Sequence, residues 1–413
     1  MNQIVKKLCE RAKTENGNVI CFSSAPARVD FLNTHQDYKM LPVVPAAIEK
    51  RTFIVCSKIR EFDTVRIKSL NLEEEGVDSE DVFQSSKVEL REDKWFGNYF
   101  RSMHMLISRK YGKIETGLAI YVDSEIPIAS GLASSAALQV SLALMYMKLL
   151  NLNLSKMELA ELAYEAEHDI MKIPCGKLDQ YASSYGGIIK LEFKPAVSIE
   201  EFNGSDITFV IADSGIKHST AEIHPVRQYE LNTAIEILRE NPLPEKLRKI
   251  FSGDYASVEW RLLREEDLRN YLGTLPQKLA NRIVFTIRMQ KSTEIALEIL
   301  KYRRVRKEDL DKLCLRPAEN WLEALGEIVN MQHIFLRDLY EVSHPKLEKM
   351  RDAGLEAGAL GVKISGAGMG GSLLALVRRD ENTSRIEKAF MDAGARSVFT
   401  TGVGKGASSA LLN

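Results

Sequence analysis

A short stretch of small residues and hydroxyls, Pro127 to Ala137 (PIASGLASSAA), separates a strand-like run from a helical run. Apolar and polar residues alternate from Leu118 to Ile126, and apolar residues recur at helical spacing from Ala136 to Leu150. A loop of this kind that opens into a helix is typical of an anion cradle, in which backbone N–H groups meet a phosphate. It is not the Walker A pattern, because no Gly-Lys-Ser/Thr ends it. The alternative is a plain turn with Ser134 or Ser135 as helix N-cap.

The composition bounds the class of protein. The 413 residues suffice for two ordinary domains or one large one, and 45% hydrophobic with 27% charged residues is typical of a soluble globular chain. A net charge of −1 excludes a global affinity for nucleic acid or an anionic membrane. Five scattered cysteines argue against a disulfide framework and predict a cytoplasmic location. We expect no signal peptide, no membrane span and no zinc site.

A dense polar group follows an apolar run near the N-terminus. Arg28 lies inside that run, so we expect it to be at least partly buried with an anionic partner. His35 and Asp37 are two residues apart, and on extended backbone their side chains would point to one face. An imidazole beside a short acceptor suits the hydroxyls of a sugar or polyol. The alternative is a hairpin turn with a solvated tip.

A carboxylate is expected at a helix start in the middle of the chain. Ser155 to Asp169 predicts an amphipathic helix with a capping box, and the chain then turns through Pro174 and Gly176 into Asp179. We expect the helix dipole to keep Asp179 ionised. An ionised Asp that faces an Arg is a plausible arrangement around a nucleophilic hydroxyl.

The last informative stretch, Val362 to Ser372, has four glycines in six residues before a strand. Its backbone must approach something closely, although a purely structural turn is the alternative. The order of helix, glycine-rich loop and strand excludes a Rossmann fingerprint. Between these motifs, Gly187 to Phe193 predicts a strand and Lys194 to Gly204 a linker. The basic run Lys301 to Lys307 is interpreted as a solvated helix end.

Together these stretches resemble the motifs of the GHMP sugar and isoprenoid kinases, and within them those of galactokinase. RVDFLNTHQDY (28–38) resembles the galactokinase signature RVNLIGEHTDY, PIASGLASSAA resembles the phosphate loop PxGxGLSSSA, and VKISGAGMGGS resembles the third, glycine-rich motif. Finer matches favour the galactokinase branch: CGKLDQ (175–180), Trp95 with Asn98-Tyr99, and HIFLRDLYEVSHP (333–345). The order and spacing of these motifs extend over nearly the whole chain.

The resemblance implies a two-domain α/β (α+β) fold of the GHMP-kinase type. Its N-terminal domain, residues 1–200, would have left-over-right βα packing that resembles domain 2 of ribosomal protein S5. Its C-terminal domain, residues 201–413, would be a ferredoxin-like α/β domain, with the active site in the cleft between the two. The implied activity is transfer of the ATP γ-phosphate to the anomeric C1 hydroxyl of galactose or a closely related sugar.

The resemblance also implies roles for residues at matching positions. Asp179 would be the base or electrostatic partner of the hydroxyl, and Arg28 would steady it and the transferred phosphate. The implied sugar-binding residues are Thr34, His35, Asp37, Gly176 and His224. The implied ATP-binding residues are Ser130, Gly131, Leu132, Ala133, Ser134, Ser135 and Ala136. The implied Mg²⁺ ligands are Ser135 and Glu167, and the cleft loop is represented by Gly366, Gly368 and Gly370. The expected cofactors are ATP and Mg²⁺, and the expected partners are the sugar and ATP alone, in a monomer or a homodimer.

The departures from the family pattern concern the sugar. Ala129 and Ala133 replace a Gly and a Ser of the phosphate loop, and both are small enough for the cradle to survive. At Thr34 galactokinases have a Glu that binds the 6-hydroxyl of galactose, and near His224 they usually have a Tyr, across a one-residue gap. A sugar carboxylate would be repelled by that Glu by about 4 kcal/mol at 4 Å. A uronic acid such as galacturonate or glucuronate is therefore an alternative substrate.

Two other functions compete with a sugar kinase. A non-catalytic sugar sensor on the same fold is disfavoured, because the serine-rich loop keeps its full length and Arg28, Ser135, Glu167 and Asp179 are all present. A different acceptor within the superfamily, such as mevalonate or homoserine, is disfavoured by the CGKLDQ and RDLYEVSHP matches.

Overall fold

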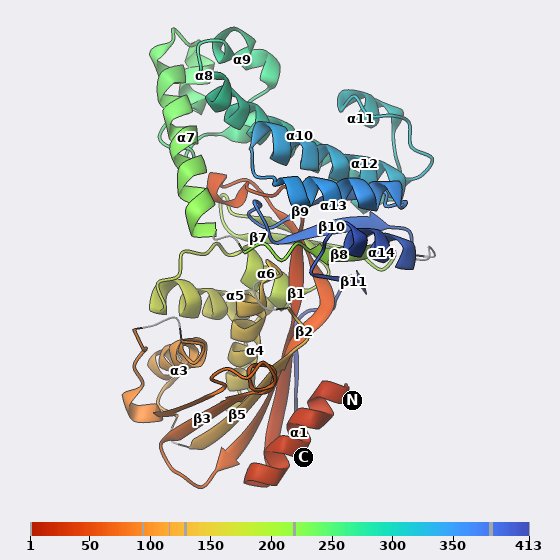
Figure 1. Cartoon of the computed structure of the whole chain (residues 1–413). Helices are drawn as coiled ribbons and strands as arrows, with labels where there is room; N and C mark the ends of the chain where they lie inside the picture. The colour runs from red at the N-terminus through yellow and green to blue at the C-terminus, as the bar shows by residue number, and fades with distance from the viewer. Residues whose placement is uncertain are drawn as a thin grey trace.

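Two β-sheets, each covered by helices, divide the molecule along its length (Figure 1). The computed structural model describes residues 2–92, 95–114, 116–127, 130–217, 220–379 and 383–412. Ile128 and Ala129 of the small-residue loop lie outside the described residues. Within the described ranges, no helix combines the length and apolar character needed to cross a membrane.

The first sheet has eight strands, six of them in the order β12-β1-β2-β5-β3-β4. Only β3 and β5 are parallel within that order, and β6 pairs with β2 and β7. The strands are β1 (Val19–Leu32), β2 (Val44–Ile59), β3 (Thr64–Ser69), β4 (Glu80–Gln84), β5 (Gly117–Ser124), β6 (Ile188–Glu192), β7 (Ser198–Phe202) and β12 (Ser408–Leu411).

Helices cover both faces of this sheet, so its alternating residues are buried on either side. Phe53 and Val55 of β2 pack toward α1, whereas Ile54 and Cys56 pack toward α3, α4 and α5. The helices are α1 (Gln3–Asn16), α2 (Leu70–Glu74), α3 (Asn98–Tyr111), α4 (Ser134–Leu149), α5 (Lys156–Glu165) and α6 (Leu178–Tyr185), with short turns η1 (Asp37–Lys39), η2 (Ser85–Lys87) and η3 (Ala166–Ile170).

The second sheet is antiparallel in the order β11-β8-β10-β9. Its strands are β8 (Thr208–Asp213), β9 (Gly361–Ser365), β10 (Ser372–Val377) and β11 (Ser397–Gly402). Its helices are α7 (Thr220–Glu240), α8 (Glu245–Ile250), α9 (Glu265–Leu272), α10 (Gln277–Tyr302), α11 (Lys307–Lys312), α12 (Trp321–Ile334), α13 (Pro345–Glu356) and α14 (Ser384–Asp392), with η4 (Trp260–Leu262) and η5 (Phe335–Leu339).

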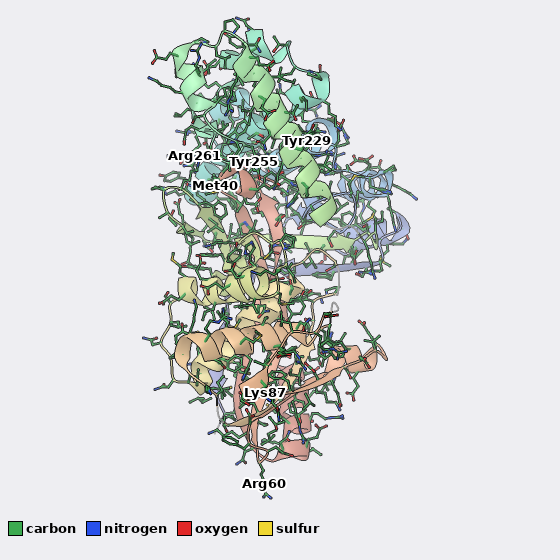
Figure 2. The ribbon with its side chains drawn as sticks, turned by 90° about the vertical axis from the view of Figure 1, so that its left-hand side faces the viewer. Met40, Arg60, Lys87, Tyr229, Tyr255 and Arg261 are labelled. Atoms are coloured by element: carbon green, nitrogen blue, oxygen red, sulfur yellow. The ribbon has the colours of Figure 1, made fainter. Side chains whose placement is uncertain are left out.

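The two halves share a core and exchange segments. Phe31 of β1 and Phe209 of β8 lie in one buried cluster, with ring centroids 5.2 Å apart. The chain around Met40 reaches the helical end of the molecule, where Leu41 joins a cluster of α7 and α10 residues (Figure 2). The last strand, β12, returns to pair with β1. The division at residue 200 stays a prediction.

The sequence misplaced several local elements. The expected linker 194–204 contains β7, which pairs with β6 and continues the first sheet. Neither Ser134 nor Ser135 is the N-cap of α4, because the helix begins at Ser134 and Ala133 holds that position with φ 59°. The predicted capping box at Ser155 and Glu158 is confirmed. The start of α4 is therefore held by docking of the small-residue loop on β1, where the Arg28 N–H donates to Leu132 O, and not by a serine cap.

Candidate active site

One cavity of about 810 Å³ collects the sequence-predicted residues from both halves of the chain. Every implied sugar-binding residue lines it, together with both implied catalytic residues and both implied metal ligands. These are Arg28, Thr34, His35, Asp37, Ser135, Glu167, Gly176, Asp179 and His224. The tertiary structure therefore brings together nine residues spread over almost 200 positions.

Arg28 is the centre of this site. The ladder between β1 and β2 shifts register at Pro26, and the Arg28 N–H donates instead to Leu132 O at 3.2 Å. The small-residue loop thereby docks on β1. The side chain of Arg28 is 9% exposed, donates to Asp179 Oδ1 at 2.7 Å and donates to Gly131 O at 2.6 Å. The prediction of a buried arginine with an anionic partner is confirmed.

Asp179 lies in the first turn of α6, as the sequence predicts. Burial raises the pKa of Asp179, the Arg28 guanidinium opposes that rise, and the nearby Asp30 carboxylate adds to it. Burial of the carboxyl group is the largest of these effects on its pKa. Its side chain is 30% exposed, so an acceptor hydroxyl can reach it from the cavity.

The sugar-signature turn is compact rather than extended. Asn33 and His35 have φ near +65°, and the 3₁₀ turn η1 begins at Asp37. The expectation that extended backbone aligns His35 with Asp37 is wrong in its geometry, although both line the cavity. Asn33 keeps this conformation because its amide donates to Pro42 O at 2.5 Å and to Gln290 Oε1 at 2.9 Å.

Both ring nitrogens of His35 have protein partners. Nε2 lies 3.0 Å from Ala367 O, which can only accept, so Nε2 carries the proton and Nδ1 accepts from the Tyr38 hydroxyl at 3.4 Å. Burial lowers the pKa of His35 well below its usual value. His35 thus fastens the glycine-rich loop of the C-terminal half to the N-terminal turn.

Two further groups complete this end of the cavity. The His224 ring lies 5.2 Å from the His35 ring, and burial lowers the pKa of His224 to about 4, so it is neutral at pH 7. Asp37 lies against Gly176, where an added Cβ would be 2.9 Å from Asp37 Oδ2. Burial and the Asp30 carboxylate raise the pKa of Asp37 to about 6. His224 and Asp37 therefore offer hydrogen-bonding groups to the cavity, and Gly176 adds no side chain there.

The small-residue loop offers backbone more than side chains. Of the seven implied ATP-binding residues, Gly131 and Ser135 line the cavity. The other five are Ser130, Leu132, Ala133, Ser134 and Ala136, of which Ser130, Leu132 and Ala136 have buried side chains. The first-turn N–H groups of α4 have no intrahelical acceptor, and they carry the positive end of the helix dipole. The loop and the start of α4 therefore have the donor chemistry that binding an anion requires.

Glu167 stands beside the loop on a π-helical turn. The π-helix η3 interrupts the regular spacing after α5, a distortion that often accompanies functional sites. Burial raises the pKa of Glu167, and Ser135 and Gln180 oppose that rise by donating hydrogen bonds. Within the described part of the chain, no cation forms an ion pair with this buried carboxylate. Its oxygens and the Ser135 hydroxyl are the hard donors that Mg²⁺ prefers, so the pair fits that ion.

The glycines of the third motif have different surroundings. Gly366 lines the cavity and donates its N–H to Asp30 Oδ2 at 3.1 Å. Gly368 and Gly370 do not line it, because added Cβ atoms would lie 2.3 Å from Val342 O and 2.6 Å from Ile216 O. Close packing against neighbouring loops, the structural alternative, accounts for these two glycines.

The structure adds cavity residues to which the sequence analysis assigned no role. Asp30 and Trp95 line the cavity, and the Arg91 guanidinium lies 4.3 Å from the centre of the Trp95 ring. Behind Thr34 is Lys363, whose side chain is completely buried in β9. A signal existed for Lys363, since a lysine inside the apolar run GVKIS needs a buried polar partner.

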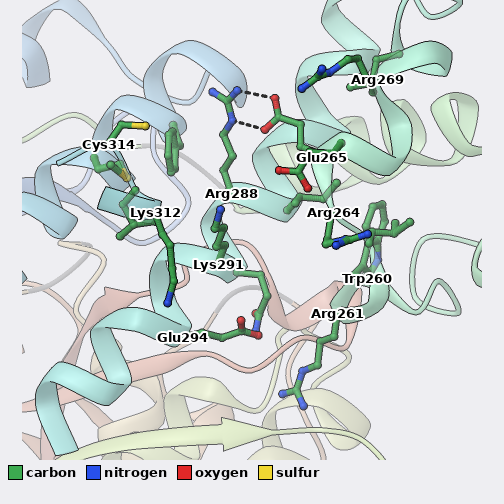
Figure 3. Close-up of a pocket in the computed structure, with 18 residues that line it drawn as sticks. Trp260, Arg261, Arg264, Glu265, Arg269, Arg288, Lys291, Glu294, Lys312 and Cys314 are labelled. Carbon is green, nitrogen blue, oxygen red and sulfur yellow. Dashed lines mark hydrogen bonds and ion pairs between the residues drawn. The ribbon is translucent and has the colours of Figure 1, made fainter. Parts of the chain in front are cut away.

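A second cavity of about 750 Å³ lies in the helical end of the C-terminal half (Figure 3). Arg288 and Glu265 face each other across it and form two hydrogen bonds of 2.7 Å. It contains none of the implied site residues. Among the described residues, no group of three or more His, Cys, Asp or Glu side chains is arranged to hold a metal ion.

Three family models match the chain. The model described as the N-terminal domain of GHMP kinases matches residues 98–187, and the model of the GHMP kinase C-terminal domain matches residues 318–396. A third, the galactokinase galactose-binding signature, matches residues 12–58. The matched segments contain the turn with Thr34, the phosphate loop, Asp179 and the third glycine-rich motif.

Relatives and solved structures agree with these models. The chain is 26% identical to a galactokinase of Clostridium perfringens, over 92% of this chain and 93% of the relative. It is 29% identical to a galactokinase of Chloroflexus aurantiacus, over 86% of this chain and 83% of the relative. The crystal structure of Lactococcus lactis galactokinase complexed with galactose superposes with a TM-score of 0.78 at 24% identity, covering 98% and 100% of the two chains. A mevalonate kinase of Methanococcus jannaschii has a TM-score of 0.62 at 17% identity, covering 95% and 98%.

Proposed function

Because this chain belongs to the GHMP kinase superfamily, we propose that it is an ATP-dependent sugar 1-kinase of the galactokinase type. It transfers the γ-phosphate of ATP to the anomeric C1 hydroxyl of galactose or a closely related sugar. The observation that carries the proposal is the Arg28–Asp179 pair, which joins the phosphate loop to the sugar-signature turn in one cavity. Nucleophile, base and phosphate donor meet there.

Asp179 would act on the acceptor hydroxyl. Its raised pKa makes it a stronger base than a solvated carboxylate, and Arg28 keeps it oriented toward the cavity. Phosphoryl transfer depends mainly on positioning and charge stabilisation, so Arg28 also stabilises the charge that develops on the transferred group. The proton of the C1 hydroxyl would pass to an Asp179 carboxylate oxygen as the new O–P bond forms and the bond between the γ-phosphorus and the bridging oxygen breaks, so that ADP leaves.

The loop and α4 would hold the ATP phosphates through backbone N–H groups. Trp95 and Arg91, stacked at the same cavity, form a planar wall that suits the adenine base. Ser135 and Glu167 would hold Mg²⁺, which supplies charge neutralisation at the phosphates when bound. The raised pKa of the unpaired Glu167 carboxylate supports this assignment.

Asp37, Gly176, His224 and Thr34 would bind the sugar, and galactose is the default substrate because the galactose-binding signature spans the turn. We assign His35 a positioning role, since both its ring nitrogens are occupied. The complete catalytic set favours an enzyme over a sugar sensor. The five free thiols support a reducing compartment such as the cytoplasm.

The test is the removal of the base. Asp179→Ala is expected to abolish ADP release with galactose and with galacturonate, whereas ATP binding, measured by calorimetry, persists because the loop is untouched. Asp179→Asn keeps the shape and removes the charge, so it should be equally inactive. Activity like that of the wild type in either variant would overturn the assignment.

A further inference from the structure

Lys363 is a buried cation without a counter-ion of its own. Its side chain is completely buried in β9, and its ammonium group donates to Asp30 O and to Thr34 Oγ1, each at 2.7 Å. Within the described part of the chain, no carboxylate lies within ion-pair distance of it. A buried ammonium group is costly unless an anion compensates it.

The nearest carboxylate is already engaged. Asp30 lies 3.4 Å from the Arg28 Nε and accepts from the Gly366 N–H at 3.1 Å. Burial lowers the pKa of Lys363 to about 7, and Asp30 only partly opposes this. The protein thus buries behind the cavity wall an amine that is about half protonated near pH 7, and no described carboxylate within ion-pair distance compensates its charge. An anionic ligand nearby would favour its charged form.

Thr34 lies between Lys363 and the cavity. Its hydroxyl accepts from Lys363, so its own proton is available to a ligand in the cavity that it lines. His224 lines the same cavity, and its ring nitrogens have no hydrogen-bond partner among the described residues. A neutral imidazole always offers one N–H donor. The Thr34 hydroxyl and one His224 nitrogen can both donate to the same acceptor, and the Lys363 amine behind Thr34 favours an acceptor that carries negative charge.

We propose that the substituent of the sugar that contacts Thr34 is an anion, so that the preferred acceptor is an acidic sugar such as a hexuronic acid. This inference rests on the proposed sugar-kinase function, and within it an acidic sugar replaces galactose as the preferred substrate. Lys363 is a positioning residue, because it acts through Thr34 rather than by contact. The Asp37 carboxylate does not lie beside the Thr34 hydroxyl, because it packs against Gly176.

The expected discrimination follows from the charges. A carboxylate that accepts from Thr34 would lie about 6 Å from the Lys363 ammonium. At an effective dielectric of about 20, that attraction corresponds to about a hundredfold in affinity. Its loss should appear mainly in KM for the acidic sugar, since the charge contributes equally to ground state and transition state.

The experiment measures ADP release with D-galacturonate, D-glucuronate and D-galactose. The wild type is expected to give a higher kcat/KM with one of the uronates than with galactose. In Lys363→Met, the uronate-to-galactose ratio of kcat/KM should fall about a hundredfold, with galactose kinetics nearly unchanged. Thr34→Val replaces the hydroxyl with a methyl group and should lower the same uronate-to-galactose ratio. This variant tests the proposal if Lys363→Met does not fold.

Lys39→Met is the matched control. Lys39 is also almost completely buried, but it donates to Gln36 Oε1 at 3.3 Å and lies among aromatic rings instead of contacting Thr34. Its loss should leave the sugar ratio unchanged. A wild type that prefers galactose overturns the inference and leaves the kinase function intact. A uronate preference that survives Lys363→Met overturns the role of Lys363. The absence of ADP release with every sugar overturns the kinase function instead.

Discussion

Arg28 joins three segments of the site, so its replacement gives the sharpest test of how the site works. Arg28→Met keeps most of the apolar stem and removes the guanidinium that binds Asp179 and Gly131 O. The Asp179 and Asp30 carboxylates would then share the cavity wall without a cation. The pKa of Asp179 should rise further, because the opposing charge is gone and the burial remains.

The magnitude follows from the pair's geometry. Charge centres about 4 Å apart at an effective dielectric of about 20 interact by about 4 kcal/mol, which corresponds to about a thousandfold in rate. We therefore expect kcat to fall about a thousandfold at saturating ATP and sugar. Removing one partner of a buried pair also costs about 3 kcal/mol of folding free energy, the low end of the usual range, because Asp179 is 30% exposed.

Arg101→Met is the matched control for that experiment. Arg101 donates to both carboxylate oxygens of Asp81, at 2.7 and 2.8 Å, and to Glu89 O at 2.8 Å, so it is a buried arginine–aspartate pair outside the cavity lining. Coupled ADP release gives kcat, and denaturant unfolding gives stability. Arg101→Met should lose at least as much stability as Arg28→Met, because Asp81 is more buried than Asp179, but only Arg28→Met should lose kcat. A kcat within threefold of wild type in a folded Arg28→Met would refute the reasoning.

Two further predictions concern the metal and pH. Glu167→Gln should raise the Mg²⁺ concentration for half-maximal activity at least tenfold, because one of two protein ligands loses its charge; an unchanged Mg²⁺ titration would contradict the assignment. Burial lowers the pKa of His104 to about 4, so the folded state resists its protonation. The contribution of neutral His104 to the free energy of unfolding is complete above pH 6.5 and should fall by about 3 kcal/mol as the pH falls to 4. His104→Gln can still form hydrogen bonds with Ser85 and Tyr146, so its free energy of unfolding should depend less on pH. Urea unfolding at each pH measures the difference.

The sequence predicted elements well where local pattern and burial agree. The capping box at Ser155 and the helix start at Asp179 depend on neighbours a few residues away, and both are confirmed. The strand β7 escaped prediction because its pairing partner β6, rather than its own polar pattern, stabilises it. The conformation of the turn at His35 also escaped, since tertiary hydrogen bonds from Asn33 to α10 hold it.

The sequence by itself determined the family, the reaction type and eleven of the residues that line the cavity, because its motifs resemble those of a known kinase family. Tertiary structure decided how those residues act. It showed that burial is the largest influence on the Asp179 pKa, that both ring nitrogens of His35 have protein partners, and that Gly368 and Gly370 pack closely against neighbouring loops. It also placed Lys363 behind Thr34, a contact over 329 positions of sequence. Electrostatics depends on distance in space, which the linear order of residues does not give.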